Sequence, residues 1–484
     1  MNIAAHVFET DEPPLTVEPE REATGRLDGR TALRAMRDLA GFGDPSVPFI
    51  ATQDEFDRAT RSYEALIQFL SAHPEKRIYG IHTYYGADIE DPRDPADWRR
   101  QQAELLRYLH VGVGEPLSRT VVRRALRIQA RKSLQGFSAI HPDTIRGLIE
   151  LSNGDALPEV PRYGSLGASG DLVPMAHAIA PVIETGGVRG PRDVLGLVNT
   201  NSMMSALAVE LFGEVRALFA GTCRATALAS IALGAGDEFC AGGTLAINPA
   251  HRRNREAGFM ILRERQAFLE RNGCEKAPSL PETAPQLRYS IRCAPQVLGN
   301  ALAQLDFAAE RIAAEALSVS DNPIIESADG TVAIAHGGLF YTAGLATAAD
   351  QMLDVACKCA EMLNRQTFLL VDPQQSGGLP RNLEGSRGDH VKGIHQLVNA
   401  LEQSLRAGGV PARNMTSPAE GYNQDIVPGS MAALLNLAER IDIAQELTRG
   451  ASFVSERAAL LRCDRAVPDR LALAAWPKFT PPEA

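Results

Sequence analysis

The stretch LATAADQMLDVACKCAEML, residues 345–363, indicates the fold class of this chain. Its residues Met352, Val355, Cys359 and Met362 recur three or four positions apart, and neither glycine nor proline interrupts them. This spacing puts all four side chains on one face of a helix. The stretch therefore predicts one long α-helix with an apolar face.

Three more stretches, at residues 203–233, 301–317 and 431–447, are rich in alanine and leucine at helical spacing. Alanine has the strongest helix propensity and lets neighbouring helices approach closely. No strand pattern separates these stretches, and the strand–helix alternation of a doubly wound sheet is missing. We therefore expect a mainly α protein with a central bundle of long helices, several of them buried on most sides.

Composition narrows the classes of function. The 484 residues include 49 lysines and arginines against 59 acids, a net charge of −10, which disfavours nucleic acid or an anionic membrane as partner. The longest uncharged stretch, residues 330–349, is broken by glycines and predicts no membrane helix. With seven cysteines in no disulfide-like spacing and no apolar leader, we expect a cytoplasmic protein with reduced thiols.

The residue composition and the hydrophobic periodicity change along the chain. Residues 1–30 have little periodicity and predict a mobile arm, and the chain from residue 477 predicts a loose tail. Residues 31–200 mix short helical patterns with glycine- and proline-rich turns, and we assign them to an N-terminal domain. Residues 201–484 are predicted to form the helical-bundle domain with the C-terminal helices.

The most unusual stretch is GSLGASGDLVP, residues 164–174. Any three of its residues could be an ordinary turn followed by a helix cap. The whole string, however, resembles the signature of the histidine and phenylalanine/tyrosine ammonia-lyase family, with Met175 where the family usually has leucine. The resemblance implies a helical architecture like that of the fumarase/aspartase proteins.

In that family the Ala-Ser-Gly tripeptide cyclises to 4-methylideneimidazol-5-one (MIO), which implies the same fate for Ala168, Ser169 and Gly170. Gly170 has no Cβ to keep its nitrogen from the Ala168 carbonyl, and Ser169 loses its hydroxyl as water. The product is an electrophile, which ordinary side chains cannot supply for amine elimination. The resemblance therefore implies no dissociable cofactor, and no residues with metal-ligand spacing are found.

Other motifs follow in family order from Tyr79 to Gln424. The segment YGIHTYYG, residues 79–86, resembles a loop whose tyrosine is the proposed base for the β-proton, which implies that role for Tyr79. His82 stands where the family has asparagine and is expected to contact the substrate. Tyr84 and Tyr85 replace Gly-Phe, which makes the loop bulkier and affects substrate identity more than reaction class. Residues 112–116, GVGEP, also match the family.

The two residues three and four places before GVGEP line the aromatic pocket in the family, and here they are Tyr108 and Leu109. Leu109 disfavours ordinary histidine as substrate, whereas Tyr108 could stack on a substrate ring or donate a hydrogen bond. Tyr108 could equally be a core aromatic of an amphipathic helix.

Further positions are implied by later motifs. Asn201 aligns with an active-site asparagine, although Asn199 is near enough to be confused with it. In QLRYSIRCAPQ, residues 286–296, Arg292 is the expected clamp for the substrate carboxylate, because its planar fork binds carboxylates bidentately. Tyr289 would exchange protons with the substrate amine, and Gln286 would orient the substrate.

The final motifs complete the predicted substrate site. Phe340, in GGLF, would press on the MIO ring, and Leu339 departs from the family's asparagine. The stretch AEGYNQD, residues 419–425, resembles that of phenylalanine lyases and implies that Glu420 and Gln424 bind substrate. Lys392 aligns with a lysine near the substrate amine and is expected to pair with the buried Glu420 carboxylate.

These observations predict an MIO-dependent ammonia-lyase for an aromatic or heteroaromatic amino acid, assembled as a homotetramer with shared active sites. Two alternatives use the same electrophile: a 2,3-aminomutase, and an ergothionase-type lyase that releases trimethylamine, for which Tyr84, Tyr85 and Tyr108 could form a cation–π surface. A fumarase/aspartase enzyme is disfavoured because its Gly-Ser-x-x-Met-Pro loop is missing. An inactive paralogue is disfavoured because the tripeptide, Tyr79 and Arg292 are all intact.

Overall fold

The computed structural model describes residues 29–91, 93–274, 286–328, 331–385, 389–468 and 471. The predicted arm and tail lie outside these residues, apart from residues 29 and 30, which begin helix α1. Within the described ranges, no helix is both long enough and apolar enough to cross a lipid bilayer.

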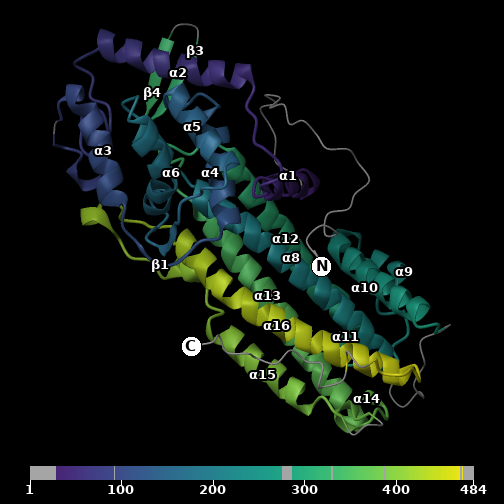
Figure 1. The fold of residues 1–484 in the computed structure, drawn as a ribbon. Coiled ribbons are helices and arrows are strands. Elements are labelled where there is room, and N and C mark those ends of the chain that lie inside the picture. Colours follow the sequence, from purple (N-terminus) through teal and green to yellow (C-terminus); the bar gives the residue numbers. More distant parts are fainter. Residues whose placement is uncertain are drawn as a thin grey trace.

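Four long helices lie side by side through the centre of the molecule (Figure 1): α8 (Ser202–Ala232), α12 (Ala294–Leu317), α13 (Ala343–Val371) and α16 (Ser430–Arg462). The prediction of a mainly α fold with a bundle of long helices is confirmed. Three further helices flank the bundle: α9 (Gly242–Ala246), α10 (Arg252–Arg271) and α15 (Lys392–Ala407).

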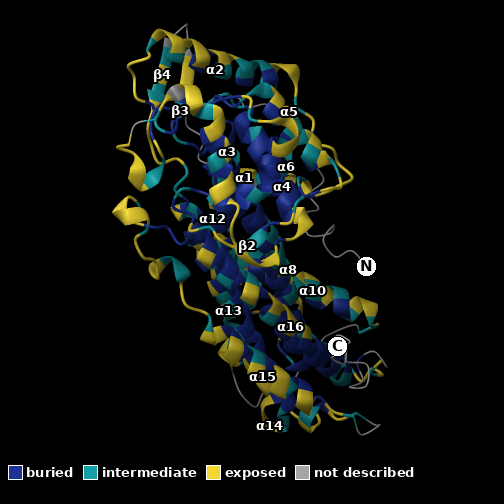
Figure 2. Ribbon diagram, turned by 60° about the vertical axis from the view of Figure 1, so that its left-hand side comes forward, coloured by how far each residue is buried: buried dark blue, intermediate teal, exposed yellow. Residues whose placement is uncertain are grey.

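Helix α8 is buried along most of its length (Figure 2). Its apolar residues lie on every side, and it contacts α10, α12, α13 and α16. A helix that is apolar all round belongs in a core rather than at a surface. Helices α13 and α16 extend beyond the predicted stretches, to Val371 and Arg462, because packing against the bundle continues past the regular apolar spacing.

Residues 29–198 form shorter helices at one end of the bundle (Figure 1). Their ends follow local rules: before α2, for example, Thr52 and Glu55 cap each other's backbone N–H groups in a capping box. These helices are α1 (Gly29–Gly41), α2 (Gln53–Ala72), α3 (Trp98–Leu109), α4 (Arg119–Ser133), α5 (Pro142–Asn153), α6 (Leu172–Gly186) and α7 (Asp193–Val198).

Two small antiparallel strand pairs position loops at this end. Strand β1 (Val113–Pro116) pairs with β2 (Pro161–Tyr163), which leads into the Ala168–Gly170 stretch. Strands β3 (Ile324–Ala328) and β4 (Thr331–Ala335) form a hairpin against α2. The short helical turns are η2 (Gly86–Asp88), η3 (Pro95–Asp97), η4 (Pro249–His251), α11 (Tyr289–Arg292), α14 (Pro373–Ser376), η5 (Arg381–Leu383), η6 (Ala412–Asn414) and η7 (Glu420–Tyr422).

The main apolar core runs without a break from Ala32 to Leu471 and includes residues from both predicted domains. Helix α8 begins at Ser202, beside the predicted boundary at residue 200, but its side chains pack against α4 as well as against the bundle. The division of the chain at residue 200 stays a prediction.

Candidate active site

The Ala168–Gly170 tripeptide forms a tight turn between β2 and α6. Gly167 and Gly170 face each other across it, with φ of 74° and 75°, values that glycine adopts without strain. Gly170 lies so close to the backbone of Thr200 that a Cβ would sit 2.7 Å from the Thr200 carbonyl carbon. Only glycine therefore fits at position 170.

The amino ends of three long helices converge on this turn. Thr342, just before α13, donates to the Gly167 carbonyl oxygen at 3.2 Å and shares a short hydrogen bond with Ser430, the first residue of α16. The Asp171 N–H donates to the Thr200 carbonyl oxygen at 2.5 Å, just before α8. The positive ends of three helix dipoles thus surround the tripeptide and favour negative charge there.

Two side-chain amides contact Ser169. The Gln424 Nε2 donates to the Ser169 Oγ at 2.8 Å, and the Asn199 Nδ2 donates to the Ser169 carbonyl oxygen at 2.8 Å. The Asn199 Oδ1 is buried, and no protein partner is found for it among the described residues. The chain therefore holds both oxygens of Ser169 with hydrogen-bond donors, and a buried acceptor remains beside them.

Asn201, the predicted active-site amide, lies two residues further on and turns away from the tripeptide. Its Nδ2 donates to the Glu315 Oε2 at 2.6 Å, and its Oδ1 accepts hydrogen bonds from Lys132 Nζ and from Ser320 Oγ. The amide that contacts the tripeptide is Asn199, because the chain turns between α7 and α8. The geometry thus replaces Asn201 by Asn199.

Buried charges lie directly beneath the tripeptide. Burial lowers the pKa of Lys132 to about 7, although the charges of Glu315 and Asp171 oppose this shift. Burial also raises the pKa of Asp171 to about 7, while hydrogen bonds from the N–H groups of Met203 and Met204, at 2.8 and 2.9 Å, lower it. Asp171 therefore caps α8 and fixes its start against the tripeptide.

Tyr79 lies in a loop before η2, and its hydroxyl accepts a hydrogen bond from the Gly86 N–H at 3.1 Å. Burial raises the pKa of Tyr79; the Gly86 hydrogen bond lowers it, the charge of Glu420 raises it and that of Arg192 lowers it. The Glu420 carboxylate lies within 3 Å of the place that a Cβ at Gly86 would take, so Glu420 packs against the Tyr79 loop. Tyr79 and Glu420 therefore share one site.

Tyr108 and Leu109 end α3 on the same side of the molecule. Tyr108 is 52% exposed, and its pKa is raised by burial and by the nearby Tyr85, Tyr79 and Glu420. Leu109, in contrast, is a core residue with 8% exposure. Of the two predicted pocket residues, Tyr108 is thus the one with a surface open to a ligand.

The side chains by which the Tyr79 loop differs from the family mostly contact other residues of this chain. His82 is 8% exposed, and its Nδ1 accepts the Ile78 N–H at 3.2 Å. The Arg93 guanidinium lies over the Tyr84 ring, 3.4 Å from its centroid, and the Tyr85 hydroxyl accepts from Gln102 at 3.0 Å. Tyr84 therefore already has a cation partner, and His82 is not placed as the substrate ligand that the sequence predicted.

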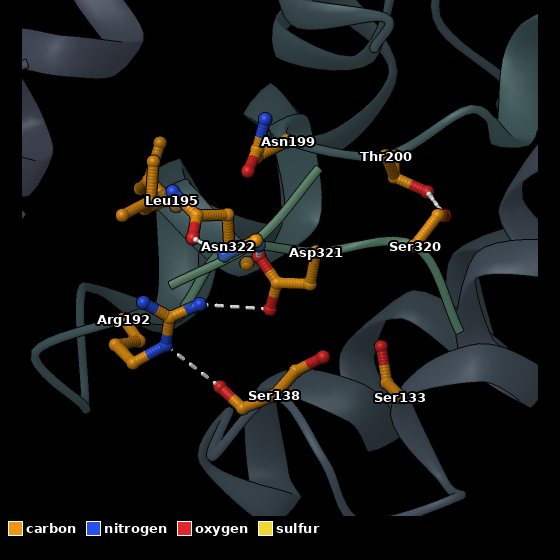
Figure 3. Close-up of polar contacts among 12 residues, drawn as sticks. Ser133, Ser138, Arg192, Leu195, Asn199, Thr200, Ser320, Asp321 and Asn322 are labelled. Carbon is orange, nitrogen blue, oxygen red and sulfur yellow. Dashed lines mark hydrogen bonds and ion pairs between the residues drawn. The ribbon is translucent and has the colours of Figure 1, made fainter. Parts of the chain in front are cut away.

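A buried ion pair stands behind the loop. The Arg192 Nη2 donates to the Asp321 Oδ2 at 2.8 Å, and the Arg192 Nε donates to the Ser138 carbonyl oxygen at 3.0 Å (Figure 3). The side chains of Arg192 and Asp321 are 0% and 1% exposed. Such a pair holds the segment after α12 firmly against the segment before α7.

Four predicted residues lie at the opposite end of the bundle: Gln286, Tyr289, Arg292 and Lys392. Gln366 of α13 bonds both Thr226 of α8 and the Ser290 carbonyl oxygen, in α11. Thr226 follows Ser202 by 24 residues and Gln366 follows Thr342 by 24 residues, so both helices put α11 about 36 Å from the tripeptide.

Lys392 is exposed at the start of α15. Asp389, three residues earlier, pairs at 2.6 Å with Arg457, and Arg457 lies 27 residues along α16, or about 40 Å, from Ser430. The predicted pair of Lys392 with Glu420 therefore does not form within one chain. Phe340 stands two residues before Thr342, at the tripeptide end.

The sequence model named aromatic amino acid lyase matches residues 38–472. The chain belongs to the aromatic amino acid lyase family. It is 33% identical over 356 residues to histidine ammonia-lyase of Geobacillus thermodenitrificans, covering 70% of each protein, and 30% identical over 423 residues to tyrosine ammonia-lyase of Cereibacter sphaeroides, covering 80% of each. The phenylalanine aminomutase of Pantoea agglomerans has the same fold, with a TM-score of 0.79, 23% identity and 90% of both chains covered. The predicted family and carbon–nitrogen lyase class are confirmed.

In this aromatic amino acid lyase, the sequence reasoning missed two polar residues beneath the tripeptide, Lys132 and Glu315. Lys132 falls in the basic stretch RRALRIQARKS, residues 123–133, which matches none of the motifs considered above. Residue type does not separate Asn199 from Asn201: Asn201 precedes α8, but its side chain makes no cap hydrogen bond there and instead binds Lys132 and Glu315. Among the described residues, no cluster of histidine, cysteine or acidic side chains could hold a metal ion.

Proposed function

We propose that this chain is an MIO-dependent ammonia-lyase that removes ammonia from an aromatic or heteroaromatic α-amino acid and leaves an α,β-unsaturated acid. The observation that carries this proposal is the Ala168–Gly170 turn, with Asn199 and Gln424 on Ser169, at the end of the molecule where Tyr79 lies. The family assignment supports the reaction class.

The residues around the tripeptide fit its conversion to MIO. Ring closure joins the Gly170 nitrogen to the Ala168 carbonyl carbon with loss of one water, and the bare Cα of Gly170 allows the close turn that this needs. A second water leaves as the Ser169 hydroxyl, towards which Gln424 donates a hydrogen bond. Asn199 donates to the Ser169 carbonyl oxygen, which draws electron density away from the new double bond.

Once formed, MIO supplies an electron-poor alkene that makes the substrate amine a better leaving group. In our proposal, Tyr79 takes the β-proton, since its hydroxyl lies at the tripeptide end and is fixed by the Gly86 N–H. Tyr108 offers an exposed ring for the substrate's aromatic group. Phe340 and Glu420 belong to the same end, and we assign them to substrate binding together with Gln424.

In our proposal, the remaining groups come from other copies of the chain. Tyr289 is 71% exposed, and the Arg292 Nε is buried with no partner found among the described residues. We assign Arg292 to the substrate carboxylate, Tyr289 and Lys392 to the amine, and Gln286 to orientation, each acting at the tripeptide of another copy. A homotetramer with shared sites satisfies this requirement by symmetry. Seven free cysteines and the charge of −10 support a cytoplasmic enzyme.

The test is to incubate the enzyme with phenylalanine, tyrosine, histidine and ergothioneine in parallel. We expect ultraviolet absorbance of an unsaturated acid together with free ammonia, and an intact mass below the encoded value by two water molecules. A β-amino acid product would indicate an aminomutase, and trimethylamine an ergothionase. The matched control is Ser169→Ala, which keeps the turn but cannot lose the hydroxyl. A full encoded mass for the wild-type chain would refute the mechanism.

A further inference from the structure

Two consecutive backbone amides of the Tyr79 loop donate to histidine rings. The Ile78 N–H donates to the Nδ1 of His82 at 3.2 Å, and the Tyr79 N–H donates to the Nε2 of His336 at 3.3 Å. One ring comes from the loop itself, and the other follows strand β4, more than 250 residues later in the chain. The backbone at the predicted base is therefore held from two sides.

A ring nitrogen that accepts an N–H must itself carry no proton. Both nitrogens are thus deprotonated, and both imidazoles are neutral. Burial lowers the pKa of His82, and the charge of Arg77 lowers it further. His336 lies at the surface; its partial burial lowers its pKa, and the charge of Arg192 lowers it further. The surroundings favour the protonation state that the hydrogen bonds need.

The second ring is anchored to the buried ion pair. The Gly337 N–H, next to His336, donates to the Asn322 Oδ1 at 3.0 Å. The Asn322 N–H in turn donates to the Asp321 Oδ1 at 2.7 Å, and Asp321 pairs with Arg192 (Figure 3). Arg192 is the charge that faces His336 from the segment before α7, and Asp321 is its counter-ion. The backbone next to His336 is therefore tied to a buried scaffold.

The first ring is fixed by its own loop. His82 is 8% exposed, and its carbonyl oxygen accepts the Arg93 N–H at 3.0 Å. The neighbouring Ile78 and Ile81 are buried in a small apolar cluster beneath the loop. The charge that acts on His82 is that of Arg77, on its own segment, and the guanidinium of Arg93 lies over the Tyr84 ring.

We propose that His82 and His336 are positioning residues that hold the Tyr79 loop in place, and that they do so only as neutral imidazoles. This rests on the proposed function, in which Tyr79 is the base. Protonation of either ring puts a proton where the backbone N–H points and breaks its hydrogen bond. Both hydrogen bonds to the loop backbone are present at neutral pH. They are lost as the pH falls below the ordinary titration range of histidine, because both histidine pKa values are lowered.

Amide side chains offer matched variants. A glutamine Oε1 can occupy the place of a histidine Nε2, and an asparagine Oδ1 the place of an Nδ1, but neither can be protonated in this range. His336→Gln and His82→Asn should therefore keep the hydrogen bonds. In His336→Asn the side chain is too short, and in His82→Gln it is too long, to place its oxygen at the position of the histidine nitrogen. These two variants should therefore lose the hydrogen bonds.

The first measurement is amide hydrogen exchange by mass spectrometry of the peptide that contains Ile78 and Tyr79, at pH 5 and pH 7, corrected for intrinsic exchange. The wild-type peptide should lose about tenfold in protection at the lower pH, whereas the double variant His82→Asn/His336→Gln should lose less than about twofold. Equal acid-induced loss in both proteins, or no loss in the wild type, would overturn the proposal. Exchange in α8 reports whether each variant is folded.

The second measurement is the pH profile of kcat. We expect His336→Gln to keep activity within about threefold at pH 8 and His336→Asn to lose about tenfold, with the acidic limb reduced in the double variant. If exchange follows the prediction but kcat does not, the two histidines do position the loop backbone, and the assignment of Tyr79 as the base is wrong. Equal rates for the two His336 variants, with equal protection of the peptide, would count against the proposal.

Discussion

If each active site combines one chain's tripeptide with another chain's arginine, two inactive variants should restore each other. Ser169→Ala removes the proposed electrophile, and Arg292→Ala removes the proposed clamp for the substrate carboxylate. In one chain, α8 and α13 each separate these positions by about 36 Å, beyond the reach of any side chain. An intact site therefore needs its tripeptide from an Arg292→Ala chain and its arginine from a Ser169→Ala chain.

The size of the recovery follows from the assembly statistics. When the two variants mix randomly in equal amounts, each of the two required chains is the right one about half the time, so about a quarter of the sites are intact. The assay is the specific activity of differently tagged, co-expressed chains after purification through both tags, compared with either variant alone. Each variant alone should show less than about 1% of wild-type activity.

A matched control uses two positions from the same end. Tyr79 and Ser169 are joined within one chain, because the loop with Glu420 and Gln424 contacts both. Mixing Ser169→Ala with Tyr79→Phe should therefore restore nothing, although mixed oligomers form equally well. Recovery in this control, or none in the first mixture despite proven mixed oligomers, would refute the shared site.

Three further predictions concern stability and maturation. Gly170→Ala, at a φ of 75° against the neighbouring backbone, should abolish the two-water mass deficit and lower the unfolding free energy by about 1–3 kcal/mol, measured by mass spectrometry and urea denaturation. Lys132→Ala removes one of the two donors to the buried Asn201 Oδ1, leaves only Ser320 Oγ, and should lower the unfolding free energy by about 1–3 kcal/mol in the same denaturation assay. Arg192→Met leaves the Asp321 carboxylate buried and unpaired and should cost about 3–5 kcal/mol, part of which Asp321→Asn added to it should restore, as thermal unfolding would show.

Contiguous motifs carried most of what the sequence could predict. The tripeptide, Tyr79 and Gln424 were each identified from a short string, and the structure brings all three to one end. The long helices followed from apolar spacing alone. Both predictions need only neighbouring residues, because residue type and periodicity within a short stretch are enough to make them.

The choice between Asn199 and Asn201 was not local. Both are amides in one five-residue stretch, and which one meets the tripeptide depends on where α7 ends and α8 begins. Asn201 was drawn into the core because Lys132 and Glu315, from two distant helices, satisfy its amide there. Spacing within the stretch contains no information about those partners.

The basic stretch of α4 depends on distant partners in the same way. Arginines are mostly exposed in folded proteins, yet Arg123, Arg124 and Arg127 are at most 5% exposed here. Their guanidiniums donate to backbone carbonyl oxygens far away in the chain, for example Arg127 to Phe42 at 3.1 Å. A buried cation needs such partners, and only the folded chain shows that they exist.

The environment of Tyr79 links catalysis to assembly. Within one chain, burial and the charge of Glu420 raise the pKa of Tyr79, and Arg192 and the Gly86 N–H oppose them. A base needs its proton removed near the working pH, so the site requires further positive charge. Arg292 and Lys392 lie at the far end of each chain and, in our proposal, reach Tyr79 only from another copy. Dissociating the oligomer should therefore weaken the base as well as remove the clamp, so that activity falls more steeply with dilution than loss of substrate binding alone would require.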